Sequence, residues 1–92
     1  MSYRVDTSPE FDRRAGLFFR KHRDLEDRFE RLVDDLRHDP FQPRLRLQPL
    51  RGKLQGKHAV RLTHAYRVTL TLLITERHIL LLDIGTHDEV YR

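Results

Sequence analysis

The amino-acid sequence predicts a small α+β domain in which two N-terminal helices pack on one face of an antiparallel sheet. Apolar residues recur at helical spacing between residues 8 and 38, whereas residues 66–85 contain two apolar runs rich in leucine and β-branched residues. The length of 92 residues suits a single modest core. We therefore expect one domain over residues 1–92, with the element order β-α-α-β-β-β.

Residues 8–12 are typical of the start of a helix. Residues 3–7 are typical of a short edge strand, and Ser8 then offers a side-chain oxygen to cap free helical N–H groups. Pro9 suits the first helical position, and Glu10 and Asp12 complement the helix dipole. Residues at positions i, i+4, i+7 and i+11 form one largely apolar face: Phe11, Ala15, Phe18 and His22.

A second helix follows a break at residues 23–24. Its end is expected at residues 38–40, because the residue before Pro40 is pushed out of the helical region. Two helices joined this closely predict an antiparallel hairpin that needs an apolar partner, which the sheet supplies. The stripe that faces the sheet comprises Leu25, Phe29, Leu32, Val33 and Leu36.

The remaining elements are strands. Residues 41–57 contain two prolines and two glycines and are expected to be mostly loop. From residue 58 the apolar period changes to two, with Ala59 and Arg61 on one side of the strand. Residues 66–75 are typical of a buried central strand, followed by a hairpin turn and a last strand to Gly85.

Composition excludes several classes of protein. The sequence contains no cysteine, so it has neither a disulfide framework nor a thiolate metal site. His58, His64 and His78 lack the spacing of a zinc site, so we expect no metal and no cofactor. No apolar segment has the length of a signal peptide or a membrane span, and we expect a cytoplasmic protein with no membrane contact.

Positive charge is concentrated in the middle of the chain. Residues 40–75 contain seven Lys and Arg residues and no Asp or Glu, whereas the flanking segments are mixed. Such a one-signed segment favours binding of a polyanion such as nucleic acid, and a solvated basic surface is the alternative. The candidates for contact with RNA or phosphate are Arg51, Lys53, Lys57, His58 and His64.

Three side chains near the predicted strand ends suit phosphodiester chemistry. His87 follows the last strand, where a histidine can deliver a proton to a leaving oxygen; the alternative is a surface histidine. Arg61 and Arg67 lie on adjacent predicted strands and can grip one phosphate if they share a face. They could instead be ordinary surface arginines, or pair with Asp83 or Asp88.

Tyr91 is the candidate for contact with a base. An aromatic ring can stack on an unpaired nucleotide, and the alternative is a tyrosine that closes the edge of the core.

These residues together resemble the RelE/ParE superfamily of type II toxins, and they are most similar to its RelE, YoeB and YafQ branch. The resemblance implies a RelE-like microbial RNase fold and a ribosome-dependent endoribonuclease that cuts mRNA in the A site. It also implies a cognate antitoxin that holds the enzyme inactive. The matching segments are residues 50–52, 61–63, 66–68 and 84–91.

The resemblance assigns roles to individual residues. His87 matches the C-terminal histidine that relatives use in acid–base catalysis, and Arg67 matches an arginine that stabilises the transition state. Arg61 falls where relatives carry a basic residue, and Tyr91 matches an aromatic that orients the mRNA base. The basic loop that faces ribosomal RNA or the scissile phosphate is matched by Arg51 and Lys53.

The chain departs from the family at the general base. Gln48 stands where relatives have a glutamate or histidine, and Ala65 stands at a second acidic position. His58 or His64 could accept the proton, or positioning and electrostatics could carry most of the rate. The rival interpretations are a ParE-like poison of DNA gyrase, which needs no acid–base residues, and a non-catalytic module that binds RNA or a partner.

Overall fold

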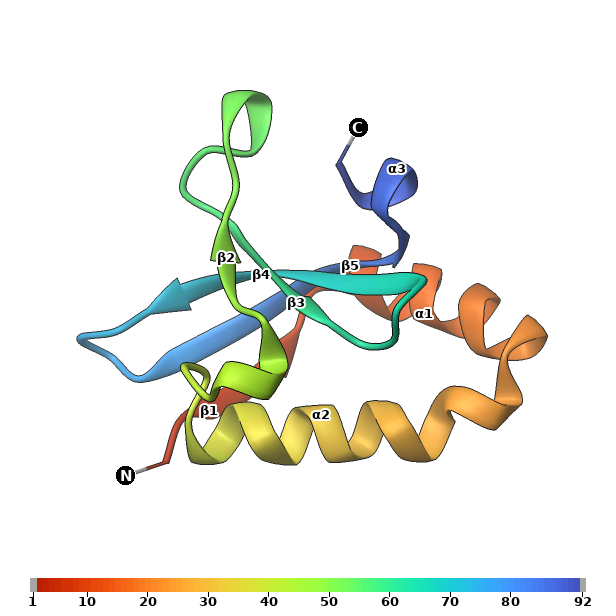
Figure 1. Cartoon of the computed structure of the whole chain (residues 1–92), viewed down its shortest axis with the longest axis horizontal. Coiled ribbons are helices and arrows are strands. Elements are labelled where there is room, and N and C mark those ends of the chain that lie inside the picture. Colours follow the sequence, from red (N-terminus) through yellow and green to blue (C-terminus); the bar gives the residue numbers. More distant parts are fainter. Residues whose placement is uncertain (1, 92) are drawn as a thin grey trace.

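The computed structural model describes residues 2–91 and confirms the predicted α+β fold, with helices covering one face of a sheet (Figure 1). The five strands follow the order β1-β5-β4-β3-β2 across the sheet. The elements are β1 (Arg4–Thr7), α1 (Pro9–Lys21), α2 (Glu26–His38), β2 (Gln48–Pro49), β3 (His58–Arg61), β4 (Tyr66–Leu73), β5 (His78–Thr86) and α3 (His87–Val90).

The helical hairpin forms as its sequence signals predict. The Ser8 side chain caps α1 by accepting a hydrogen bond from the N–H of Phe11 (3.0 Å). Phe29 of α2 stacks on Phe11 with ring centroids 5.8 Å apart, and it also contacts Phe19. Aromatic pairs at these separations stabilise contact beyond their buried area, so these rings join the two helices.

One face of the sheet forms the core with the helices. Val60 of β3 lies opposite Val68 of β4, and Leu70 of β4 lies opposite Leu81 of β5. All four side chains are fully buried, together with Leu36 of α2. Because side chains alternate between the two faces of a strand, the residues between them point to the opposite face.

The sheet differs from the antiparallel prediction at β1, which pairs in parallel with β5. Parallel neighbours need a long connection, and the chain between β1 and β5, both helices included, supplies it. The sequence also did not predict the two-residue strand β2, which pairs with β3. The register of β4 and β5 shifts by one residue between Thr69 and Leu70, so that Leu82 is an extra residue on β5.

The residues that follow β5 form a short helix, α3, which the sequence did not predict. In Figure 1 this helix, α3, and the loop around β2 both rise above the sheet, while α2 lies below it. Both segments therefore flank the sheet face that the helices leave uncovered. Within residues 2–91, no helix is both long and apolar enough to cross a membrane.

Candidate active site

Arg61 and Arg67 lie directly opposite each other on β3 and β4. The neighbouring pair, Val60 and Val68, faces the core, so the two arginines share the uncovered face, as the site hypothesis required. Both side chains are half-buried. Side chains opposite each other on antiparallel strands have Cβ atoms about 4.5–5.5 Å apart, which is close enough for two guanidinium groups to hold one phosphate.

No carboxylate neutralises this pair of arginines within residues 2–91. The possible pairing with Asp83 is wrong, because Asp83 accepts a hydrogen bond from Arg14 of α1. The possible pairing with Asp88 is wrong as well, since that carboxylate lies 3.6 Å from the ring of His87 instead. Two uncompensated positive charges side by side favour an anionic ligand.

His87 is the first residue of α3, immediately after β5. Thr86 caps α3: its side chain accepts from the N–H of Glu89 (3.2 Å), and its own N–H donates to Glu89 Oε1 (2.8 Å). This reciprocal pair is a capping box, which fixes where the helix begins. Val90 is buried and anchors the helix to the core. His87 is therefore held at the strand end, with its side chain 61% exposed.

The geometry brings His87 to the arginine end of the sheet. Gly85 lies opposite Arg67, and Thr86 lies opposite Tyr66, so β5 delivers His87 beside the start of β4. The helix α3 contacts β4 as well as β5. The predicted histidine and the two predicted arginines thus belong to the same end of three adjacent strands.

Tyr91 packs its ring against His87, with centroids 4.1 Å apart in an edge-to-face arrangement. Its hydroxyl accepts a hydrogen bond from Gln48 Nε2 (2.9 Å). The side chain is half-buried, so the alternative of a tyrosine closing the core edge holds in part. Tyr91 nevertheless contacts the two flanking segments of the site rather than the centre of the core.

The Gln48–Tyr91 bond connects the β2 loop to α3 across the sheet. On the uncovered face of the sheet, Gln48 of β2 lies opposite Ala59 of β3, which lies opposite Thr69 of β4. The hydrogen bond from Gln48 to Tyr91 therefore passes over the small side chains of Ala59 and Thr69. Thr69 is only 3% exposed. From the sequence, Gln48 stood out only because it replaces the general base of related toxins. Its hydrogen bond to Tyr91 joins residues 43 positions apart, and no local sequence pattern predicts such a contact.

A pocket of about 370 Å³ opens beside this bond. Its wall combines the Gln48 amide, the Tyr91 ring, the aliphatic side chains of Leu50 and Leu54, and Arg51. An aromatic ring, apolar walls and two polar groups are the combination that accepts a planar heterocycle next to a phosphate.

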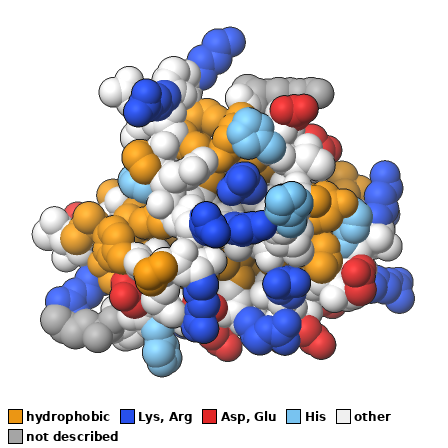
Figure 2. Space-filling view, in the orientation of Figure 1, with side chains coloured by type: hydrophobic (Ala, Val, Ile, Leu, Met, Phe, Trp, Pro, Cys, Tyr) orange, Lys and Arg blue, Asp and Glu red, His pale blue; other side chains and the backbone are white. Residues whose placement is uncertain are grey.

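The basic loop is mostly exposed. Arg51 and Lys53 are exposed and Lys57 is half-buried. Figure 2 shows Lys, Arg and His side chains gathered in the middle of this face of the molecule, with Asp and Glu nearer its rim. A polyanion approaching this face therefore meets positive charge first.

The two histidines predicted to contact RNA lie in different places. His64 is in the turn between β3 and β4, where its Nδ1 accepts from Arg61 Nη2 (2.8 Å). Since arginine only donates, this contact leaves the ring proton of His64 on Nε2. His58 lies opposite Leu70 and so points to the helix-covered face, away from Arg61. The structure therefore does not bring His58 to the site.

No three His, Asp or Glu side chains converge as a metal site within the described part of the chain. The pKa of Asp6 is lowered by its hydrogen bond from His78, with help from Arg4. Asp6 and Arg4 lie on the edge strand β1, and His78 is the first residue of β5, at the end of that strand away from His87.

The structure is similar to solved structures of bacterial toxins. YafQ from E. coli strain BL21(DE3) superposes with a TM-score of 0.81 at 15% identity, over 98% of this chain and 99% of that chain. A YoeB/ParE toxin from Agrobacterium tumefaciens gives a TM-score of 0.75 at 14% identity, over 91% and 98%. A chain of the E. coli DinJ-YafQ toxin-antitoxin complex gives 0.79 at 16% identity, over 100% of both chains.

No family model matches the chain, and no curated protein matches it. The similarity therefore lies in the arrangement of the elements, which extends over almost the whole of each chain. The chain has the fold of the YafQ and YoeB toxins.

Proposed function

We propose that this chain is the toxin of a type II toxin–antitoxin system, an endoribonuclease that cuts mRNA in the A site of translating ribosomes in the cytoplasm. The observation that supports this most strongly is the grouping of Arg61, Arg67 and His87 at one end of three adjacent strands. The fold shared with YafQ and YoeB toxins agrees with it.

The two arginines act on the scissile phosphate. In the proposed reaction the ribose 2′ oxygen attacks the adjacent phosphorus, and negative charge builds on the non-bridging oxygens. Guanidinium groups of Arg61 and Arg67 stabilise that charge, because both lie on the exposed sheet face without a carboxylate partner. Loss of one such donor typically lowers the rate about 10²–10³-fold.

His87 is the general acid. As the bond from phosphorus to the 5′ oxygen breaks, the protonated ring gives its proton to that oxygen, leaving a 5′ hydroxyl and a 2′,3′-cyclic phosphate. The proton from the 2′ hydroxyl passes to solvent water. Gln48 cannot accept it, and His64 uses its lone pair to accept from Arg61. Most of the rate enhancement then comes from the positioning of the RNA and from stabilisation of the phosphate charge by Arg61 and Arg67.

Tyr91 and the basic loop hold the RNA. The Tyr91 ring stacks on a base of the A-site codon while its edge-to-face contact fixes the plane of His87. Arg51, Lys53 and Lys57 contact phosphates of mRNA or ribosomal RNA. Such contacts orient the strand without reading its sequence.

The partner of this toxin is a cognate antitoxin. Solved complexes of the related fold pair YafQ with DinJ, which supports a protein partner for this chain. Complementary charge speeds association, so a basic site favours an antitoxin with acidic segments.

The direct test is primer extension on an mRNA translated in a reconstituted system, with a control that lacks ribosomes. We expect cuts inside A-site codons only when ribosomes are present, and cut ends that carry a cyclic phosphate. Absence of cuts under both conditions would contradict the proposal. Inhibition of gyrase supercoiling by the same preparation would then identify a ParE-like activity.

A further inference from the structure

The turn between β3 and β4 carries a histidine that contacts one of the two arginines of the site. His64 lies in this turn, and its Nδ1 atom lies 2.8 Å from Nη2 of Arg61. Arginine only donates, so the imidazole is the acceptor and its Nδ1 atom carries no proton. The bond therefore joins an arginine that acts on the phosphate to a neutral ring that has no part in the proton transfers.

The backbone around His64 is fixed by four hydrogen bonds. The Thr63 hydroxyl accepts from the N–H groups of Ala65 (3.1 Å) and Tyr66 (3.2 Å). The N–H groups of Leu62 and Thr63 both donate to the carbonyl oxygen of Tyr66, at 2.9 and 3.1 Å. Threonine side chains that bond to nearby backbone groups stabilise turns. The His64 side chain therefore extends from a backbone that the turn holds in place.

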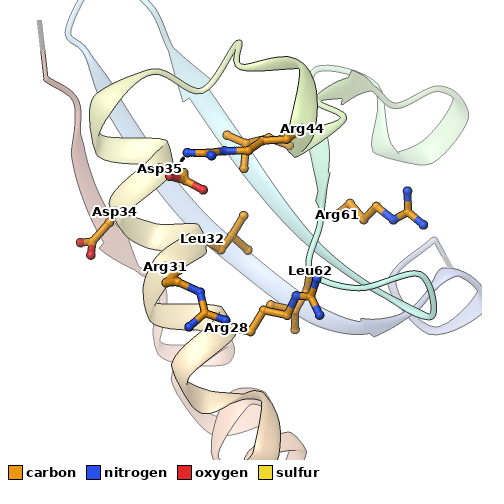
Figure 3. A pocket seen from close by; sticks show the side chains of 9 residues that line it. Arg28, Arg31, Leu32, Asp34, Asp35, Arg44, Arg61 and Leu62 are labelled. Carbon is orange, nitrogen blue, oxygen red and sulfur yellow. Dashed lines mark hydrogen bonds and ion pairs between the residues drawn. The ribbon is translucent and has the colours of Figure 1, made fainter.

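The bond to His64 also selects one direction for the Arg61 side chain. Arg61 borders a pocket of about 520 Å³ between α2 and β3. Figure 3 shows its guanidinium turned away from Arg28 and Arg31 of α2. A long side chain otherwise samples many rotamers, and that freedom is lost when it binds a ligand. Holding Arg61 in one direction beforehand reduces this entropic cost.

A single bond to Nη2 leaves Arg61 able to bind a phosphate. A guanidinium group has two edges that each present a pair of parallel N–H donors, and Nη2 contributes one hydrogen to each edge. The bond to His64 occupies one of these hydrogens, so the other edge stays complete. A carboxylate in place of the imidazole would bring a negative charge that repels phosphate. A neutral ring orients the arginine without this repulsion.

We propose that neutral His64 is a positioning residue, which holds the Arg61 guanidinium ready for the scissile phosphate and releases it when the ring is protonated. This rests on the proposed function in naming the phosphate as that of mRNA. A protonated imidazole has no lone pair to offer Arg61, and it adds a positive charge beside Arg61 and Arg67. Acid therefore removes the support of Arg61, whereas alkali removes the proton of the general acid His87.

The side chains at this end of the sheet do not reverse that effect. The neighbouring elements contribute these charged and titratable groups: Arg61 of β3, Arg67 of β4, His22 after α1, Arg28 and Arg31 of α2, and His87, Asp88 and Glu89 of α3. Both carboxylates already have contacts on α3, since Asp88 lies 3.6 Å from the His87 ring and Glu89 accepts from the N–H of Thr86. Protonation of His64 thus adds charge to a mostly positive surface.

The first test follows the side-chain nitrogens of Arg61 and His64 by NMR of the isolated protein, with no RNA or ribosomes present. At about pH 8 we expect slow rotation of the Arg61 guanidinium and an unprotonated Nδ1 at His64. Both signatures should disappear as the pH falls to about 5, across the range in which histidine titrates. His64→Asn places an amide oxygen where Nδ1 lies, so it should keep Arg61 ordered over the whole range. His64→Ala should leave Arg61 mobile at every pH.

The second test measures what the bond contributes to the site. His64→Ala should weaken binding of inorganic phosphate about three- to tenfold at about pH 8, because ordering one long side chain costs that much affinity. Its single-turnover cleavage rate on ribosomes should fall by a similar factor. The wild-type rate should decline toward acidic and alkaline pH, and His64→Asn should remove only the acidic decline. The matched control, His38→Ala at the exposed end of α2, should change none of these quantities.

Equal mobility of Arg61 in wild type and His64→Ala would overturn the proposal, and so would equal affinity of the two proteins for phosphate. An acidic decline in rate that persists in His64→Asn would overturn the role of protonation. If wild type does not cleave mRNA while Arg61 is ordered and His64→Ala binds phosphate more weakly, the proposed function fails and positioning by His64 stands.

Discussion

Replacing Gly85 with alanine should loosen the short helix that carries His87 while the domain stays folded. A Cβ atom at Gly85 would lie 2.9 Å from Glu89 Oε1 and 3.2 Å from Glu89 Cβ, so the Glu89 side chain has to move. That movement breaks its bond from the Thr86 N–H, which is one half of the capping box of α3. The substitution thus acts on the support of the site and not on its chemistry.

The expected magnitudes follow from two opposing terms. Loss of a helix cap costs about 0.5–2 kcal/mol, whereas replacing a strand glycine with alanine returns about 0.5–1 kcal/mol by reducing backbone entropy. The free energy of unfolding should therefore change by less than about 1 kcal/mol. The cost falls locally on α3, where about 1 kcal/mol lowers the ratio of ordered to frayed helix about fivefold. Cleavage follows the fraction of molecules in which α3 is ordered, so it should fall by at most this factor.

The assay combines hydrogen exchange with cleavage. The Tyr91 amide donates to the carbonyl of His87 (3.2 Å), so its protection reports the order of α3. The matched control is Gly16→Ala in α1, where a Cβ meets nothing within 4 Å and alanine favours the helix. If Gly85→Ala kept the wild-type protection at Tyr91 and the wild-type cleavage rate, the reasoning would be refuted.

Three further predictions concern separate parts of the molecule. Arg67→Gln should lower the single-turnover cleavage rate about 10²–10³-fold, whereas Arg13→Gln on the exposed face of α1 should not change it. Leu36→Ala empties a fully buried position in α2 and should lower the free energy of unfolding in urea by about 2–5 kcal/mol. The hydrogen bond from His78 lowers the pKa of Asp6, so its stabilising effect is present above the ordinary pKa of the carboxyl and is lost as the pH falls through the lowered value. Asp6→Asn should therefore flatten the pH dependence of unfolding below about pH 4, measured by thermal unfolding, and an unchanged slope would contradict this assignment.

Most helices and strands were predictable because their boundaries depend on residues that are close in the sequence. Ser8 and Pro9 start α1, and the segment before Pro40 ends α2, as the capping and steric rules require. The alternation from residue 58 onward placed Arg61 on the face opposite Val60. Each of these features depends on neighbours in the sequence, so it is readable without the fold.

The features that the sequence did not predict depend on distant contacts. The parallel pairing of β1 with β5 joins the two ends of the chain, and β2 exists only because Gln48 and Pro49 meet β3. The capping box of α3 was present in the sequence as Thr86 and Glu89, but the short polar segment had no helical periodicity to support it.

In the candidate site too, some features depend on sequence neighbours and others on contacts between distant residues. Arg61, Arg67 and His87 were identifiable because each lies at the end of a strand whose position the apolar runs define. The contact of Gln48 with Tyr91, and the exclusion of His58 from the site, became visible only when strand pairing fixed which side chains share a face.

The central claim is that His87 protonates the leaving oxygen during cleavage of mRNA. It is tested most directly by the single-turnover cleavage rate of wild type and His87→Ala on ribosomes that carry a defined codon in the A site. We expect the variant to fold with an unchanged free energy of unfolding, because the side chain is exposed, and to cleave about 10²–10⁴-fold more slowly. Cleavage by His87→Ala at the wild-type rate would contradict the account.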